Sequence, residues 1–148
     1  MRIKLVFPEK VVFTTQVPIR ITDINYGNHV GNDRMLTLAH EARVQWFASL
    51  GYSELEVDGN GLIMADAAIQ FLAEAFYGDD LIIEMGIDDI RSSSFDVHYR
   101  FLVSRNNVKI EVARVKTAMV FFNYSVRKVS PMSEKFRRTL EDLLSQNT

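Results

Sequence analysis

The stretch "DINYGNHVGNDRMLTLAHEARVQWFASLGY", residues 23–52, joins a polar, glycine-containing segment directly to an apolar one. Its first ten residues contain one Asp, three Asn, one His and two Gly, which is typical of a loop with a specific backbone shape. In the remainder, apolar residues recur at helical spacing; Asn32 or Asp33 is suited to cap the start of a helix and Gly51 to end it. The apolar stripe consists of Met35, Leu38, Ala39, Ala42 and Trp46, widened by Leu36, Phe47 and Leu50. The stretch therefore predicts a loop that leads into one long helix, which other structure wraps.

Strand-like segments lie on both sides of this helix. Residues 10–22 are rich in β-branched types, and Pro18 favours an edge position or a bulge. "RNN" at 105–107 is a candidate hairpin turn. Four further segments after the helix have strand-like patterns, namely 62–76, 81–90, 94–104 and 108–124.

The order of these segments indicates the fold class. Ser130 and Pro131 are expected as the N-cap and first residue of a C-terminal helix. Strands grouped together after one helix favour an α+β fold with an antiparallel sheet. In the segment 94–104, polar residues alternate with a core stripe, and His98 falls on the polar side, where we expect it to be exposed.

Composition restricts the possible functions. The 148 residues fit one domain, 1–148, with 47% hydrophobic and 24% charged residues and a formal net charge of −2. This balance gives no whole-protein attraction to nucleic acid. The chain has no Cys, which excludes disulfides. With only three His and no Cys, we do not expect a structural metal site. We see no secretory signal and no membrane-inserting segment, and the lack of cysteine fits a reducing compartment, so we expect a cytoplasmic protein.

Several motifs together resemble the hotdog-fold acyl-CoA thioesterases, most closely the 4-hydroxybenzoyl-CoA thioesterase type, over about residues 8–140. The loop is similar to the family pattern D-x-D-x-x-G-H-V-N-N, with Asp23 and Asn25 at the two Asp positions and 29–32 at H-V-N-N. "HEARVQWFASLGY", the strands of 68–101 and "VRKVSPMSEKF" resemble later family segments. The resemblance implies a hotdog fold, with an antiparallel sheet wrapped around one long central helix. It also implies hydrolysis of an acyl-CoA or related thioester, with coenzyme A as part of the substrate and no other cofactor.

The resemblance also implies roles for residues of the loop. The backbone N–H of Asn32, at the positive end of the helix, is the candidate to hold the thioester oxygen as it gains charge. Gly31 allows the substrate to approach the backbone, and Tyr26 is expected to contact it. The family's second Asp acts as nucleophile or general base, but Asn25 occupies that position here. A neutral amide cannot take a proton from water, so another residue must do so.

Three residues are candidates for this base. His29 lies in the loop itself. His40 falls where a second branch, the phenylacetyl-CoA type, carries its catalytic acid within a pattern like L-A-D. Glu41 lies roughly 200° around the helix from Ala39 and faces away from the apolar stripe. Each has a plain alternative: His29 bonds loop carbonyls, His40 is a boundary histidine, and Glu41 forms an ion pair with an arginine.

Arg91, Ser92 and Ser93, in the run "RSSSF", are candidates for binding a phosphate of coenzyme A; the alternative is a polar start to a strand. The predicted fold has too few helices to cover the exposed strand edges of the sheet. We therefore expect a second copy of the chain to cover them, in a homodimer or homotetramer. The second possible function is a non-catalytic protein that binds acyl thioesters or acyl chains after losing the carboxylate at Asn25.

Overall fold

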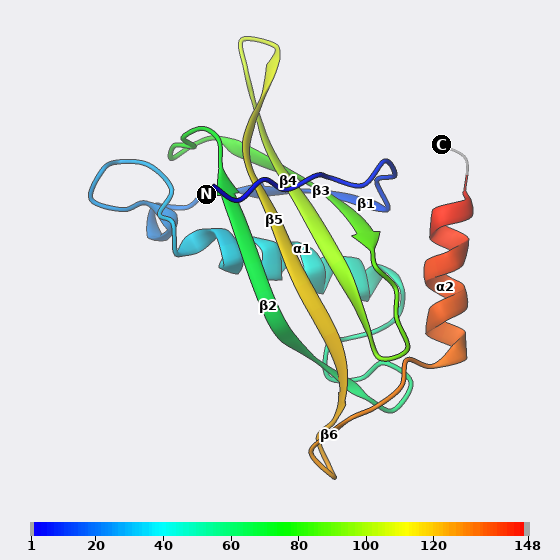
Figure 1. Cartoon of the computed structure of the whole chain (residues 1–148). Coiled ribbons are helices and arrows are strands. Elements are labelled where there is room, and N and C mark those ends of the chain that lie inside the picture. The colour runs from blue at the N-terminus through cyan, green and yellow to red at the C-terminus, as the bar shows by residue number, and fades with distance from the viewer. Residues whose placement is uncertain (1, 147–148) are drawn as a thin grey trace.

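Six strands form one antiparallel sheet, and a long helix runs across one of its faces. The structure is a computed structural model that describes residues 2–146. The sheet order is β1-β3-β4-β5-β2, with β6 paired to the end of β5, and Figure 1 shows α1 behind this sheet. The elements are β1 (Phe13–Pro18), a 3-10 turn (Ile21–Asp23), α1 (Arg34–Ser49), β2 (Gly61–Phe71), β3 (Asp80–Asp88), β4 (Ser94–Arg105), β5 (Val108–Asn123), β6 (Lys128–Val129) and α2 (Glu134–Ser145). The predicted α+β class and antiparallel sheet are confirmed.

The core lies between α1 and the sheet. Trp46 and Phe47 of α1 are fully buried, and the Trp46 ring lies 6.4 Å from that of Phe95 on β4. The alternate residues of β4 that face the helix are all buried, namely Phe95, Val97, Tyr99, Phe101 and Val103. Among the described residues, neither helix is long and apolar enough to cross a membrane.

The two ends of α1 agree only in part with those predicted from the sequence. Asp33 stands at the N-cap, one of the two predicted positions, but it has helical conformation and its side chain makes no capping hydrogen bond. At the other end, Gly51 has φ of +84°, which favours glycine and ends the helix as predicted. The predicted hairpin turn is also confirmed, because Asn106 and Asn107 both have positive φ between β4 and β5.

Other helix and strand boundaries differ from those predicted, because long-range hydrogen bonds override the local conformational preference of the sequence. The strand predicted over 62–76 ends at Phe71, where the N–H groups of both Leu72 and Ala73 donate to Val112 O. The C-terminal helix begins after Ser133, not at Ser130, because Met132 N–H bonds to Ser92 O and holds this segment extended. The strand predicted over 10–22 is confined to β1 and is followed by the 3-10 turn.

The first residues of the chain cover the outer face of the sheet. In Figure 1 this arm crosses in front of β2, β5 and β4. Leu5 N–H donates to the Gln70 side chain at 3.0 Å, and the Arg114 guanidinium donates to Leu5 O at 2.8 Å. A Cβ on Gly86 would lie 3.1 Å from Lys10 O, so the arm passes closely over this glycine. Gly86 is the cross-strand neighbour of His98, which is 8% exposed; the prediction of an exposed His98 is therefore wrong.

The burial of His98 makes stability depend on pH. Burial lowers the pKa of His98 below its ordinary value, and the nearby Asp88 and Asp96 offset this only partly. Below about pH 6.5 the unfolded chain therefore takes up a proton that the folded chain does not, and the free energy of unfolding falls. We expect His98→Gln to remove this contribution, whose slope is at most about 1.4 kcal/mol per pH unit.

Urea unfolding between about pH 7.5 and 5.5 measures the effect, because the raised pKa of Asp96, caused by burial, acts in the opposite direction at lower pH. The same slope in the wild type and in His98→Gln would contradict the assignment.

Candidate functional site

The loop 23–32 is tied to the start of α1 by its own polar groups. The buried carboxylate of Asp23 accepts a hydrogen bond from Arg20 N–H at 2.9 Å. Gly31 N–H donates to Asp23 O, and Arg34 N–H donates in turn to Gly31 O, both at 3.0 Å. A Cβ on Gly31 would lie 2.6 Å from Asp33 Oδ1, so a larger residue here would require the Asp33 side chain to move. Asp23 therefore shapes the loop.

The tip of the loop closes on itself around Asn25. Asn25 N–H donates to His29 O at 2.9 Å, and the Asn25 side-chain oxygen accepts from Gly27 N–H at 2.8 Å. This is the Asx-turn arrangement. A Cβ placed on Gly27 would lie 3.1 Å from His29 Nε2 and 3.3 Å from Asn25 Oδ1. The side chains of Asn25 and His29 therefore converge beside Gly27.

His29 presents one ring nitrogen to a pocket. Its Nδ1 lies 3.1 Å from Val30 O, which only accepts, so we assign the proton to Nδ1 and leave Nε2 as an acceptor. Nε2 lies 3.9 Å from Glu74 Oε1. The pocket has a volume of about 250 Å³ and is lined by His29, Val30, Asn32, Met35 and residues 71–75. We refer to it as the His29 pocket.

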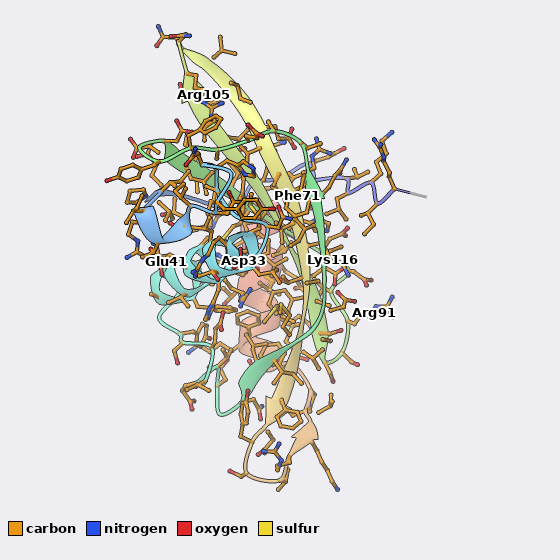
Figure 2. All side chains as sticks on the ribbon, turned by 90° about the vertical axis from the view of Figure 1, so that its left-hand side faces the viewer. Asp33, Glu41, Phe71, Arg91, Arg105 and Lys116 are labelled. Carbon is orange, nitrogen blue, oxygen red and sulfur yellow. The ribbon has the colours of Figure 1, made fainter. Side chains whose placement is uncertain are left out.

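Asn32, the residue before the N-cap of α1, lies at this pocket. Within residues 2–146, Asn32 N–H has no hydrogen-bond acceptor, and Asn32 lines the pocket. Figure 2 shows Asp33 at the helix start and Phe71 at the end of β2 toward the same side of the molecule. The structure thus brings His29 and Asn32 together, as the sequence predicted, while Tyr26 is fully exposed at the loop tip and does not line the pocket.

His40 belongs to a different cluster. It lies eight residues beyond Asn32, about 12 Å along the helix axis, and its Nε2 lies 3.3 Å from Glu54 Oε2. Glu54 also pairs with Arg43, which donates to the Tyr99 hydroxyl at 2.8 Å. Within one chain, His40 therefore has the partners of a boundary histidine and does not reach the His29 pocket.

Glu41 is exposed and accepts a hydrogen bond from Gln45 at 2.9 Å, so its partner is not the arginine that the alternative expected. It does not line the His29 pocket.

The run at 91–93 lies elsewhere as well. The Arg91 side chain bonds to Asp89 at 3.0 Å, and the carbonyls of Ser92 and Ser93 accept from Met132 N–H and Phe121 N–H. The bond from Met132 joins the residues before β4 to the segment before α2, and the bond from Phe121 joins them to β5. This arrangement fits the polar start of a strand. In Figure 2, Arg91 lies well apart from Asp33 and Phe71.

Glu74 is a pocket residue that no sequence pattern indicated. It stands just after β2, in a stretch that alternation assigned to the strand, and it is the only carboxylate among the described residues lining the pocket. The one available signal was a single acidic residue within the apolar stretch "FLAEAF", 71–76.

Comparison with known proteins places this geometry in a family. The model of the thioesterase-like superfamily matches residues 19–140. The 1,4-dihydroxy-2-naphthoyl-CoA hydrolase of Synechocystis is 25% identical over 134 residues, which cover 88% of this chain and 96% of that protein.

Solved structures agree with this match. A 1,4-dihydroxy-2-naphthoyl-CoA thioesterase from Synechocystis superposes with a TM-score of 0.79 at 25% identity, covering 90% of this chain and 98% of the other. A 4-hydroxybenzoyl CoA thioesterase variant, complexed with 4-hydroxybenzoyl CoA, gives 0.77 at 21% identity, covering 85% and 96%. The resemblance on which the hotdog fold and thioesterase activity were predicted is thereby confirmed: the chain belongs to the thioesterase-like superfamily.

Proposed function

We propose that this chain is a cytoplasmic enzyme that hydrolyses acyl-CoA thioesters in the His29 pocket. The observation that carries the assignment is the meeting of three features in one cavity. These are an imidazole nitrogen that carries no proton, an unpaired N–H just before the N-cap of α1, and an apolar lining. Membership in the thioesterase-like superfamily supports the reaction class.

The geometry supports a direct attack by water. The thioester oxygen binds at Asn32 N–H, where the positive end of α1 stabilises the charge that develops on it. His29 Nε2 takes a proton from the water as its oxygen bonds to the carbonyl carbon. The C–S bond then breaks, and the proton passes to the leaving thiolate, giving free acid and thiol. Asn25 is an amide and supports the loop beside Nε2.

The pocket suits a compact acyl group. Its volume of about 250 Å³ lies below the usual range for drug-sized ligands, and Phe71 at its rim is half exposed. The relatives named above act on naphthoyl and benzoyl thioesters. We therefore propose a small aromatic acyl group as the preferred substrate.

We also propose that the chain works as a homodimer or homotetramer. β2 is an edge strand of 11 residues, and its outer edge pairs with no strand among residues 2–146. Met64 and Phe71 of β2, on the side that faces α1, are about half exposed because the helix does not cover them. A long edge with apolar side chains is stable when another chain covers it.

Light scattering at micromolar concentration tests this association. We expect a mass of at least twice the 17.0 kDa of one chain, whereas a monomer would contradict the proposal.

Release of free thiol from a panel of aromatic and aliphatic acyl-CoAs tests the activity itself. We expect turnover that is fastest with aromatic substrates. Binding of acyl-CoA without thiol release would instead favour the non-catalytic binding protein.

Paired variants of the two histidines locate the base. We expect His29→Gln to lower kcat/KM roughly 10²–10⁴-fold, because the variant lacks the imidazole that takes the proton from water. His40→Gln is the matched control and should keep nearly full activity, because its cluster lies away from the pocket. Loss of activity in His40→Gln alone, in a variant that folds normally by circular dichroism, would move the base to α1.

Asn25→Asp restores the family's carboxylate beside His29. We expect it to keep or raise kcat/KM, since the side-chain oxygen that accepts from Gly27 N–H is retained. A clear loss of activity in the folded variant would show that the amide itself is required.

A further inference from the structure

The carboxylate that the family pattern has at position 25 is missing here, yet the His29 pocket contains one. Glu74 Oε1 lies 3.9 Å from His29 Nε2, which is too far for a direct hydrogen bond. Both atoms are acceptors, because His29 carries its proton on Nδ1. Two acceptors at this separation match the two O–H groups of a single water molecule.

The backbone around Glu74 is fixed although it belongs to no helix or strand. Ala73 N–H donates to Val112 O at 3.0 Å, and the Arg105 guanidinium donates to Glu74 O at 3.0 Å. Val30 N–H donates to Ala75 O at 2.8 Å. This last bond joins the residue after His29 to the residue after Glu74, so the backbone itself holds the two side chains side by side.

We propose that Glu74 is a further catalytic residue, which supplies the carboxylate that Asn25 lacks. The inference rests on the hydrolase function proposed above. The attacking water donates one hydrogen bond to His29 Nε2 and the other to Glu74. As the water oxygen bonds to the carbonyl carbon, one proton moves to Nε2, and the Glu74 carboxylate stabilises the imidazolium that forms. When the C–S bond breaks, that proton passes to the thiolate.

Other carboxylates of the chain are less suited to this role. Glu41 accepts from Gln45 on an exposed face of α1. Asp66 pairs with Lys116 at 2.8 Å, and its cross-strand neighbour Ala118 lies beside Asp96 on the outer face of the sheet. Among the carboxylates of residues 2–146, Glu74 alone combines a place in the pocket with nearness to an imidazole nitrogen.

Four variants test the proposal: Glu74→Gln, Glu74→Asp, Glu74→Gln combined with Asn25→Asp, and the control Glu141→Gln on an exposed face of α2. Steady-state kinetics with the best acyl-CoA of the panel gives kcat and KM, and circular dichroism checks folding. We expect Glu74→Gln to lower kcat about 10²-fold with little change in KM, because the glutamine keeps size and polarity but loses charge. Glu141→Gln should match the wild type.

The activity of the double variant distinguishes a catalytic role of Glu74 from a structural one, because a purely structural defect would not be repaired by a carboxylate at position 25. Asn25 Oδ1 and His29 Nε2 both lie beside Gly27, so an aspartate at position 25 places a carboxylate next to the same nitrogen. We expect Asn25→Asp to restore most of the activity that Glu74→Gln loses. The single variant Glu74→Asp should retain part of the wild-type activity.

The outcomes separate the two proposals. An active wild type together with a fully active Glu74→Gln overturns the role of Glu74 and leaves the hydrolase function standing. The role of Glu74 is also overturned if the Glu74→Gln variant folds normally and has a reduced kcat, but adding Asn25→Asp does not restore activity. A wild type that binds acyl-CoAs but releases no thiol overturns the hydrolase function, and the role of Glu74 with it.

Discussion

The buried guanidinium of Arg43 fixes where α1 lies on the sheet, and the rest of the site depends on that position. Arg43 pairs with Glu54 and donates to the Tyr99 hydroxyl, which bonds in turn to Thr117 at 2.9 Å. Burial raises the pKa of Tyr99, so the phenol stays protonated. These bonds connect α1, the loop after it, β4 and β5. Removing one partner would leave a buried charge without compensation, so sliding of the helix is strongly disfavoured.

Because α1 is held in this way, its first turn has a fixed position relative to the sheet. The N–H of Asn32 and the loop that precedes it therefore meet the end of β2 at the same side of the sheet in every molecule. An oxyanion site is effective when its donors are positioned before the charge develops, because no reorganisation is then needed. The buried polar cluster that contains Arg43 and Tyr99 thus fixes the helix that borders the proposed site, without contacting the pocket.

Local patterns in the sequence identified those features that depend on neighbouring residues. Apolar spacing predicted α1, alternation predicted the strands, and composition predicted the loop, while the family resemblance made His29 and Asn32 candidates for the site. Features set by long-range backbone bonds escaped prediction. α2 starts late because Met132 bonds to Ser92, and His98 is buried because the N-terminal arm crosses the sheet. The proximity of Glu74 to His29 depends on one bond between segments 45 residues apart, which no local pattern encodes.

The loop chemistry shows which part of the family aspartate's role an amide at position 25 can keep. Asp23 and Asn25 both use a side-chain oxygen to accept a backbone N–H, from Arg20 and Gly27, and this role needs an acceptor but no charge. An amide therefore preserves the shape of the loop while losing the ability to act as a base. The negative charge has to come from another segment, and the bond from Val30 to Ala75 brings one into place. Shape and charge, which a single aspartate combines in the family pattern, are divided here between two segments that the sheet holds together.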